Sequence, residues 1–284
     1  MAVKISQRRR MWLAFVRNRT ALIGAIIALL IVLVALCAPL LSPFEPLEQD
    51  PFNRLEPSSA QHWLGTDDFG RDVLSRIIYG SRVSLIIGTA SVLLGLALGT
   101  LFGMLAGYLR GRTETLVMRG IDVMMCFPDL ILAIAVTAAL GSNLFNLILT
   151  IGIVMTPRFA RIAHGAILAL KESEYVIAAQ AIGATTPRIM ARHILPNIFG
   201  ELLVAATLWV GVAIRLEANL AFIGLGVQPP TPTWGNMIRQ GVDVLINAPG
   251  ISVYSGLAIL ITILSFNMLG DGLRDITDPK LRGE

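Results

Sequence analysis

The chain has 284 residues, of which 55% are hydrophobic and only 15% are charged. Its mean hydropathy of +0.70 lies far outside the range of a soluble domain, so a membrane protein is predicted. The formal net charge is only +4, and no basic, aromatic-interleaved surface points to binding of nucleic acid.

Uncharged apolar runs recur along the chain, and about 20 residues are enough for a helix to cross the hydrocarbon layer. The runs cover residues 20–44, 83–109, 130–157 and 244–270, and a further span fits 200–224, although Arg215 and Glu217 interrupt it. The third run can hold two spans hinged at 141–143, with the first of them starting near Leu116. Six transmembrane helices are therefore predicted.

Positive charge gives the orientation. With a cytoplasmic amino terminus, most of the 23 Lys and Arg residues fall on the cytoplasmic side, which is the usual bias of membrane proteins. We therefore expect both termini inside: a cytoplasmic segment at 1–20, a first helix at 21–41, an extracytoplasmic segment at 42–82 with an interfacial helix, and a cytoplasmic tail at 272–284.

The segment before the second span contains three carboxylates, Asp67, Asp68 and Asp72. Three acids so close together could hold a metal ion, but Arg71 and Arg76 interleave them. Helix capping and ion pairing are the favoured interpretation.

Gly95, Gly99, Gly103 and Gly107 repeat at every fourth residue of the second predicted span. Such a repeat forms one smooth stripe along a helix, where another backbone can approach closely. The stripe predicts helix packing, within the subunit or against a partner, rather than contact with a transported substrate.

A polar, mostly helix-forming segment lies between the apolar runs that end at residue 157 and begin at residue 200. Ala178, Ala179 and Gly183 would give a helix a nearly bare face that another protein can approach, and Pro196 is expected to stop the helix. This pattern predicts a docking element.

Arg215 and Glu217 interrupt the run 200–224. Ionisable groups within a span usually face an interior or a wet cavity, so both are candidates for lining a translocation pathway. Reaching groups on a partner subunit is an equally good interpretation. Two residues apart on a helix, the side chains point in different directions and are not expected to pair with each other.

No catalytic or metal site is predicted. His62, His164 and His193 lack a metal-binding spacing, and no serine lies in a nucleophile-elbow sequence. None of the three lysines follows a glycine, which excludes a phosphate-binding loop of the Gly-Lys-Ser/Thr kind. Any energy from ATP must come from another subunit.

The pattern Ala178-Ala179-x-x-x-Gly183, followed by Pro196, resembles the EAA loop of binding-protein-dependent ABC importer permeases. Residues 63–76, 228–235 and 266–279 are similar to the C-type permease of the dipeptide, oligopeptide, glutathione and nickel branch, so the resemblance covers nearly the whole chain. Ile177 and His193 depart from the loop consensus, where a glutamate and an isoleucine are usual.

The resemblance implies an all-α polytopic membrane protein with the type I ABC importer (MetI-like) permease fold. It places the ABC transmembrane domain at 83–271 and the coupling loop at 158–197. The residues carried over as ATPase-coupling are Glu174, Ala178, Ala179, Gly183, Arg192 and Pro196, and it stays open whether Glu174 or Arg192 makes the principal contact.

The implied partners are a second homologous permease, two cytoplasmic ABC ATPases that bind ATP and Mg, an extracytoplasmic solute-binding protein and membrane lipid. The implied location is a bacterial inner membrane, and this chain is expected to bind no cofactor itself. Short peptides are the favoured cargo, with nickel or glutathione as alternatives. Two other classes, an ion-coupled secondary transporter and a membrane-embedded enzyme, fit the sequence less well.

Overall fold

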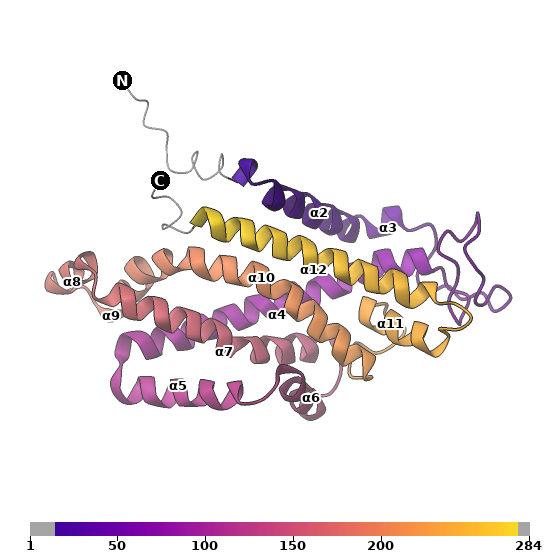
Figure 1. Ribbon diagram of the computed structural model, residues 1–284. Helices are drawn as coiled ribbons and strands as arrows, with labels where there is room; N and C mark the ends of the chain where they lie inside the picture. Colours follow the sequence, from indigo (N-terminus) through magenta and orange to yellow (C-terminus); the bar gives the residue numbers. More distant parts are fainter. Residues whose placement is uncertain (1–14, 278–284) are drawn as a thin grey trace, which may run out of the picture.

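The structure is a computed structural model that describes residues 15–277. In that range every regular element is a helix, and Thr66 and Asp72 form one isolated β-bridge. The predicted all-α polytopic fold is confirmed (Figure 1). In chain order the elements are α2 (Arg19–Leu36), α3 (Ala38–Leu41), α4 (Val73–Leu109), α5 (Gly111–Met125), α6 (Asp129–Leu140), α7 (Leu144–Lys171), α8 (Glu174–Ala181), α9 (Thr186–Ile189), the π-helix η1 (Met190–Ile194), α10 (Leu195–Phe222), α11 (Trp234–Asp243) and α12 (Gly250–Thr277).

Five helical stretches are long and apolar enough to cross a membrane: α2, α4, α7, α12 and the stretch formed by α9, η1 and α10. The sixth predicted span corresponds to α5 and α6, which pass the same test together but are bent by 99°. The bend falls where Pro128 precedes the first residue of α6, because proline cannot donate the backbone hydrogen bond that a continuous helix needs.

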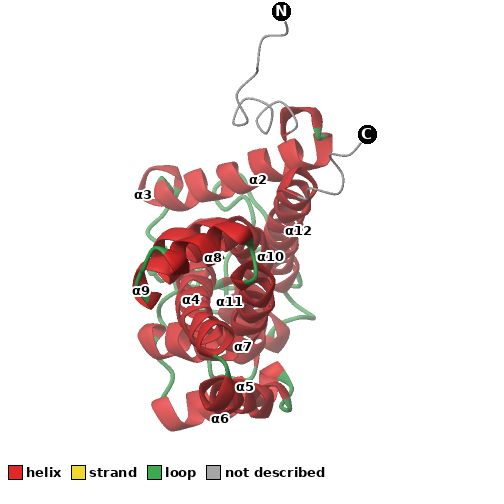
Figure 2. Cartoon of the chain, turned by 90° about the vertical axis from the view of Figure 1, so that its left-hand side faces the viewer, coloured by secondary structure: helices red, strands yellow, loops and turns green. Residues whose placement is uncertain are grey.

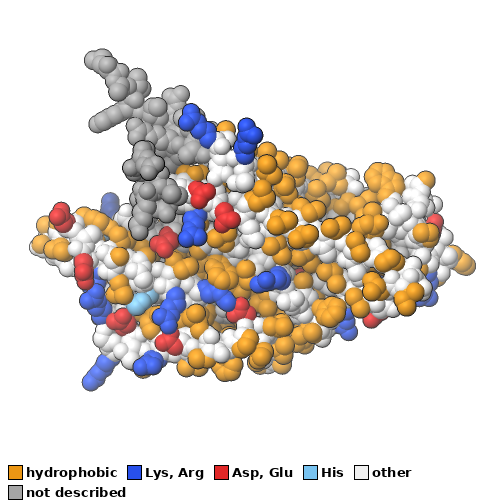
Figure 3. All heavy atoms as spheres, in the orientation of Figure 1, with side chains coloured by type: hydrophobic (Ala, Val, Ile, Leu, Met, Phe, Trp, Pro, Cys, Tyr) orange, Lys and Arg blue, Asp and Glu red, His pale blue; other side chains and the backbone are white. Residues whose placement is uncertain are grey.

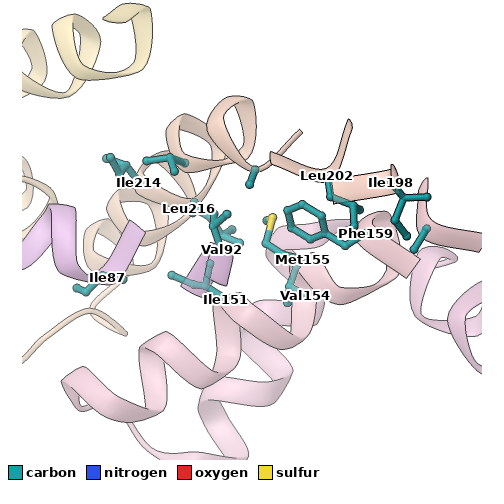
Figure 4. Close-up of a cluster of buried hydrophobic side chains, with 14 of the residues drawn as sticks. Ile87, Val92, Ile151, Val154, Met155, Phe159, Ile198, Leu202, Ile214 and Leu216 are labelled. Atoms are coloured by element: carbon teal, nitrogen blue, oxygen red, sulfur yellow. The ribbon is translucent and has the colours of Figure 1, made fainter. Parts of the chain in front are cut away.

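The helices form a layered bundle in which α4 and α7 make the most extensive contact. Figure 2 shows α2 on one side of the group formed by α4, α7 and α10, and α5 and α6 on the opposite side. The largest apolar cluster fills the space between α4, α7 and α10 (Figure 4). Phe159, Ile151, Met155 and Ile214 are fully buried there.

The glycine stripe of α4 is what lets α7 come so close. A Cβ added to Gly99 would lie 2.5 Å from the carbonyl oxygen of Thr156, and one added to Gly103 would lie 2.6 Å from that of Ala160. No side chain fits at such distances, so the two backbones are in direct contact. The stripe therefore packs within the chain.

α4 begins at Val73, well before the expected start of the span at residue 83. Asp72 caps its first turn, where the carboxylate accepts a hydrogen bond from the backbone N–H of Ser75 at 2.7 Å. Because the cap lies directly before the membrane span, the interfacial helix expected at 42–82 is instead the first part of α4.

α7 also exceeds its expected bounds, since it continues to Lys171 and leaves a much shorter loop than 158–197. Three polar side chains of this extension lie next to acids of α5 and α6. The pairs are Arg158 with Asp129, Arg161 with Asp122, and His164 with Glu114. At the other terminus, α12 reaches Thr277, so the beginning of the expected tail at 272–284 is helical as far as the structure describes it.

Candidate functional site: a docking element and the charged residues of the bundle

α8 and α9 project from one end of the bundle, beyond the ends of α7 and α10 (Figure 1). The predicted helix in this polar segment is present as α8. Val176, Ala179, Ile189 and Ile194 are buried and join the main apolar cluster. These side chains anchor the projecting element to the bundle.

Tyr108, at the end of α4, provides a second anchor. Its hydroxyl accepts a hydrogen bond from the Gln180 side-chain amide at 3.3 Å. Its carbonyl accepts one from the Lys171 ammonium, which also lies 4.9 Å from the tyrosine ring. Sequence reasoning missed this tyrosine, because residues so distant along the chain leave no local pattern.

The outer face of α8 is apolar and open. Tyr175, Ile177 and Ile182 are exposed, and Ile182 retains 86% of its surface. Ala178, the small residue of the predicted bare face, is exposed among them, whereas Ala179 points into the bundle. Figure 3 shows apolar atoms reaching the surface at this end among charged groups. Exposed apolar patches that are rimmed by charge are typical of protein interaction sites.

Gly183 ends α8 for a backbone reason rather than by offering a bare face. Its φ of +80° is left-handed, a conformation that glycine adopts without strain. Its N–H donates to the Gln180 carbonyl at 2.9 Å, and the N–H of Ala184 donates to the Ala179 carbonyl at 3.0 Å. This pair of bonds is a Schellman motif. A Cβ at Gly183 would meet no atom within 4 Å, so only the backbone conformation selects glycine here.

Pro196 does not stop the helix, contrary to the sequence-based expectation. The helical backbone continues from Thr186 to Phe222. A π turn at η1 comes directly before the proline, and the N–H of Leu195 donates to the carbonyl of Met190 five residues back. The wider turn accommodates a residue that has no N–H and whose ring would crowd an ordinary α turn.

Glu174 and Arg192 are the charged candidates of the predicted coupling loop. Both side chains are exposed, at the first residue of α8 and within η1 respectively. Within residues 15–277 neither side chain makes a hydrogen bond or an ion pair. Both are therefore available to an interacting surface.

Arg215 and Glu217 lie on different faces of α10, as expected for two residues so spaced. Arg215 is exposed, whereas Glu217 is fully buried beside Thr233 at the start of α11. Neither oxygen of the Glu217 carboxylate has a partner at hydrogen-bond geometry in the described part of the chain. Because Glu217 is covered, only Arg215 is on a face open to a pathway or a partner in this structure.

At the opposite end of the bundle, the acids and arginines of the segment before α4 form a buried ion-pair network. The Asp67 carboxylate accepts hydrogen bonds from Arg71 at 2.7 Å and lies 3.2 Å from the Nε of Arg76. His62 lies 3.0 Å from the capping carboxylate of Asp72. Over residues 15–277 no group of His, Cys, Asp and Glu is arranged to hold a metal ion. The network has the geometry of capping and pairing.

Asp68 lies at the edge of this network, with an oxygen 3.8 Å from the Arg71 guanidinium. Partial burial raises the pKa of Asp68 above its ordinary value, and the nearby Asp67 carboxylate raises it further. Arg71 acts in the opposite direction but does not cancel these effects. The surroundings of Asp68 therefore favour the protonated form of its carboxyl group.

The fold and the docking element together define a polytopic subunit of a membrane transport system. The family of binding-protein-dependent transport system inner membrane components matches residues 99–283, and the N-terminal TM domain of oligopeptide transport permease C matches residues 6–57. The chain belongs to this family of binding-protein-dependent inner membrane components, and the resemblance drawn from its motifs is confirmed.

Named relatives cover most of the chain. It is 43% identical to the dipeptide transport system permease protein DppC of Alkalihalophilus pseudofirmus over 94% of this chain and 88% of that one. It is 42% identical to the glutathione transport system permease protein GsiD of Pectobacterium atrosepticum (96% and 91%). It is 43% identical to the di/tripeptide transport system permease protein DppC of Pseudomonas aeruginosa (98% and 93%).

A solved structure supports the fold. The inward-facing MetNI methionine ABC transporter contains a chain that aligns with a TM-score of 0.60 at 20% identity, covering 72% of this chain and 98% of that one. At this identity the likeness concerns the fold alone.

Proposed function

We propose that this chain is the permease subunit of an importer for short peptides and that α8 is the helix through which separate ATPases drive it. The exposed apolar face of α8 carries the proposal, since a helix that lays an apolar face in a partner's groove is a common mode of recognition. The peptide cargo is supported by relatives named for dipeptides, for di/tripeptides and for glutathione, which is itself a tripeptide.

The anchors of α8 make it suitable as a lever. The buried Val176 and Ala179 and the hydrogen bond of Gln180 to Tyr108 connect it to the bundle, and the helical path from α9 leads without a break into α10. When two ATPases close on ATP, the displacement of α8 would pass to α4 and α10. Nucleotide binding to the ATPases shifts the conformation of the bundle only if the ATPases bind its two conformations with different affinity.

The proposed assembly contains a second homologous permease, two ATPases that bind ATP and Mg, and a solute-binding protein. The α8 end and both termini would be cytoplasmic in an inner membrane, and the α11 end would face the binding protein. Arg215, which is exposed on α10, would then face either the pathway between the two permeases or the second permease itself. This chain would contribute no step of ATP hydrolysis.

Reconstitution tests the proposal. The complete importer, in liposomes with ATP inside and binding protein outside, should accumulate a radiolabelled dipeptide, and purification of this chain should bring an ABC ATPase with it. Glutathione, the cargo named for relatives at 42% identity, is the second candidate and should be tested as a competitor. Dipeptide uptake by the chain alone, driven by an ion gradient, would contradict the assignment.

A further inference from the structure

A pocket of about 350 Å³ lies at the end of the bundle opposite α8. One wall is the loop 224–229 after α10, and the other is the face of α11 that carries Asn236, Arg239, Gln240 and Asp243. Gln228 donates a hydrogen bond at 2.9 Å to Ser142, which lies between α6 and α7. The pocket thus lies where the ends of α10, α11 and the α6–α7 connection meet, and its size is within the range of small-molecule sites.

The exposed Arg239 side chain lies over a glycine at this pocket. A Cβ added to Gly224 would lie 2.7 Å from one terminal nitrogen of the Arg239 guanidinium, so the guanidinium rests on the bare Cα. Gly224 has a φ of +89°, which further favours glycine. Within residues 15–277 this guanidinium has no hydrogen-bond or ion-pair partner. An exposed, unpaired guanidinium fork suits a carboxylate.

Asp243 provides the opposite charge one helical turn away. It also has no partner within the described range, and it does not pair with Arg239. Side chains four residues apart on a helix have Cβ atoms roughly 5–6 Å apart, and a dipeptide spans at most about 7 Å. Both ends of a short peptide are therefore within reach of these two exposed side chains.

Amides complete the polar lining. The side-chain oxygen of Gln240 accepts a hydrogen bond from Arg76 at 3.1 Å. Its amide nitrogen is therefore left to donate to a ligand. Asn236 donates to the carbonyl of Val227 and so fixes the loop against α11. A cation, an anion and amide groups line one pocket, and this combination suits a zwitterion better than an apolar ligand.

We propose that this pocket binds short peptides by their charged termini, with Arg239 on the carboxylate and Asp243 on the ammonium. The inference rests on the proposed function, because it makes the pocket a receiving site at the mouth of the peptide pathway. It adds a substrate-binding role for this chain that does not depend on the binding protein.

The test uses the assembled importer in nanodiscs, without ATP or binding protein. Gln228→Cys places a thiol on the pocket wall, and its rate of reaction with a maleimide is followed by mass spectrometry of the fragment that contains residue 228. Alanyl-alanine should slow the labelling. Alanyl-alanine amide, which lacks the carboxylate, and N-acetyl-alanyl-alanine, which lacks the ammonium, should each protect less well.

Charge-removing variants then assign the two ends. Arg239→Gln should raise the half-protecting concentration of alanyl-alanine about tenfold, because a charge-assisted hydrogen bond is lost, and should leave that of the amide unchanged. Asp243→Asn should show the reciprocal pattern, with N-acetyl-alanyl-alanine unchanged. Arg82→Gln, which removes another exposed arginine outside the pocket, is the matched control and should change nothing.

Two results with the peptides would overturn the inference: absence of protection by any of the three, or equal protection by all three that Arg239→Gln does not alter. In a further measurement, the binding protein is added without peptide. Protection seen only with the binding protein would also overturn the inference and would mark the pocket as a docking contact. If the Gln228→Cys complex imports dipeptide but the peptide gives no protection, the pocket assignment fails and the importer function stands. If protection is seen but no peptide is ever imported, the proposed function fails instead.

Discussion

Two polar segments lie at opposite ends of this bundle, and they differ in the burial and pairing of their charged side chains. The ion-pair network before α4 buries its charges, with Asp67 held between Arg71 and Arg76. The element formed by α8 and α9 leaves Glu174 and Arg192 exposed and unpaired in the described part of the chain. It also exposes apolar side chains such as Ile177 and Ile182, as the segment before α4 does at Phe52 and Trp63.

The comparison shows which charges are matched within the chain. A buried network whose charges are matched stabilises a fixed arrangement, and removal of one member leaves uncompensated charge. An exposed apolar helix face gains its stabilisation only when another surface covers it. Substitutions in the buried network should therefore act on folding, and substitutions of the exposed side chains of α8 should act on assembly.

Asp67→Asn should give the largest effect. It removes the carboxylate that neutralises two buried guanidinium groups, and breaking a buried pair from one side costs about 3–5 kcal/mol. Thermal unfolding of the purified permease in detergent should show a large drop in Tm or a failure to accumulate in the membrane. Unchanged stability would mean that the network is not what holds this segment.

Ile182→Asp should leave folding intact but weaken assembly. Ile182 is 86% exposed, so the charge costs nothing in the free subunit, whereas a central apolar contact in an interface is worth about 2 kcal/mol. Co-purification with the ATPase should fall by more than tenfold, and peptide uptake should fall with it. Ile246→Asp, at a 97% exposed position at the other end of the bundle, is the control and should retain the ATPase.

Gly183→Ala and Gly165→Ala should change stability in opposite directions. Neither position would bring a new Cβ within 4 Å of another atom. At Gly183 the left-handed backbone costs an alanine about 1 kcal/mol, while in the middle of α7 alanine gains about 0.5–1 kcal/mol over glycine. Thermal unfolding of the two variants measures both signs. Two shifts of the same sign would contradict the Schellman motif.

A bulky residue at Gly183 addresses coupling rather than stability. The protein should still insert in the membrane, but the end of α8 should move and hydrolysis of ATP should no longer drive uptake. The measurement is the ratio of transported peptide to hydrolysed ATP. Normal coupling would show that the end of α8 has no mechanical role.

Asp68→Asn should have the smallest effect on stability, and the size of this effect should depend on pH. Burial raises the pKa of Asp68, so the folded state binds the proton more tightly than the unfolded state does. The charge therefore lowers stability at neutral pH, and this cost disappears as the pH falls below the ordinary pKa of an aspartate, about 3.9. The variant should be slightly more stable than the parent at pH 7 and equal to it at acidic pH, as measured by thermal unfolding.

Several parts of the structure could be predicted because their causes are local. The apolar runs mark the spans, and the alanine-rich stretch at 174–183 marks α8. The glycine repeat in α4 indicates close packing before any neighbour is known. Other features could not be predicted, because they join residues that are distant along the chain: Asp129 of α6 and Asp122 of α5 pair with Arg158 and Arg161 of α7.

The sequence by itself determined a helical membrane protein with a polar element between its spans, since hydropathy and helix propensity depend on neighbouring residues. The tertiary structure alone decided that α7 is the neighbour of the glycine stripe, that Tyr108 holds α8, and that Glu217 is covered while Arg215 is open. Those facts depend on which helix faces lie against each other. The free energy of that packing comes from contacts between residues far apart along the chain.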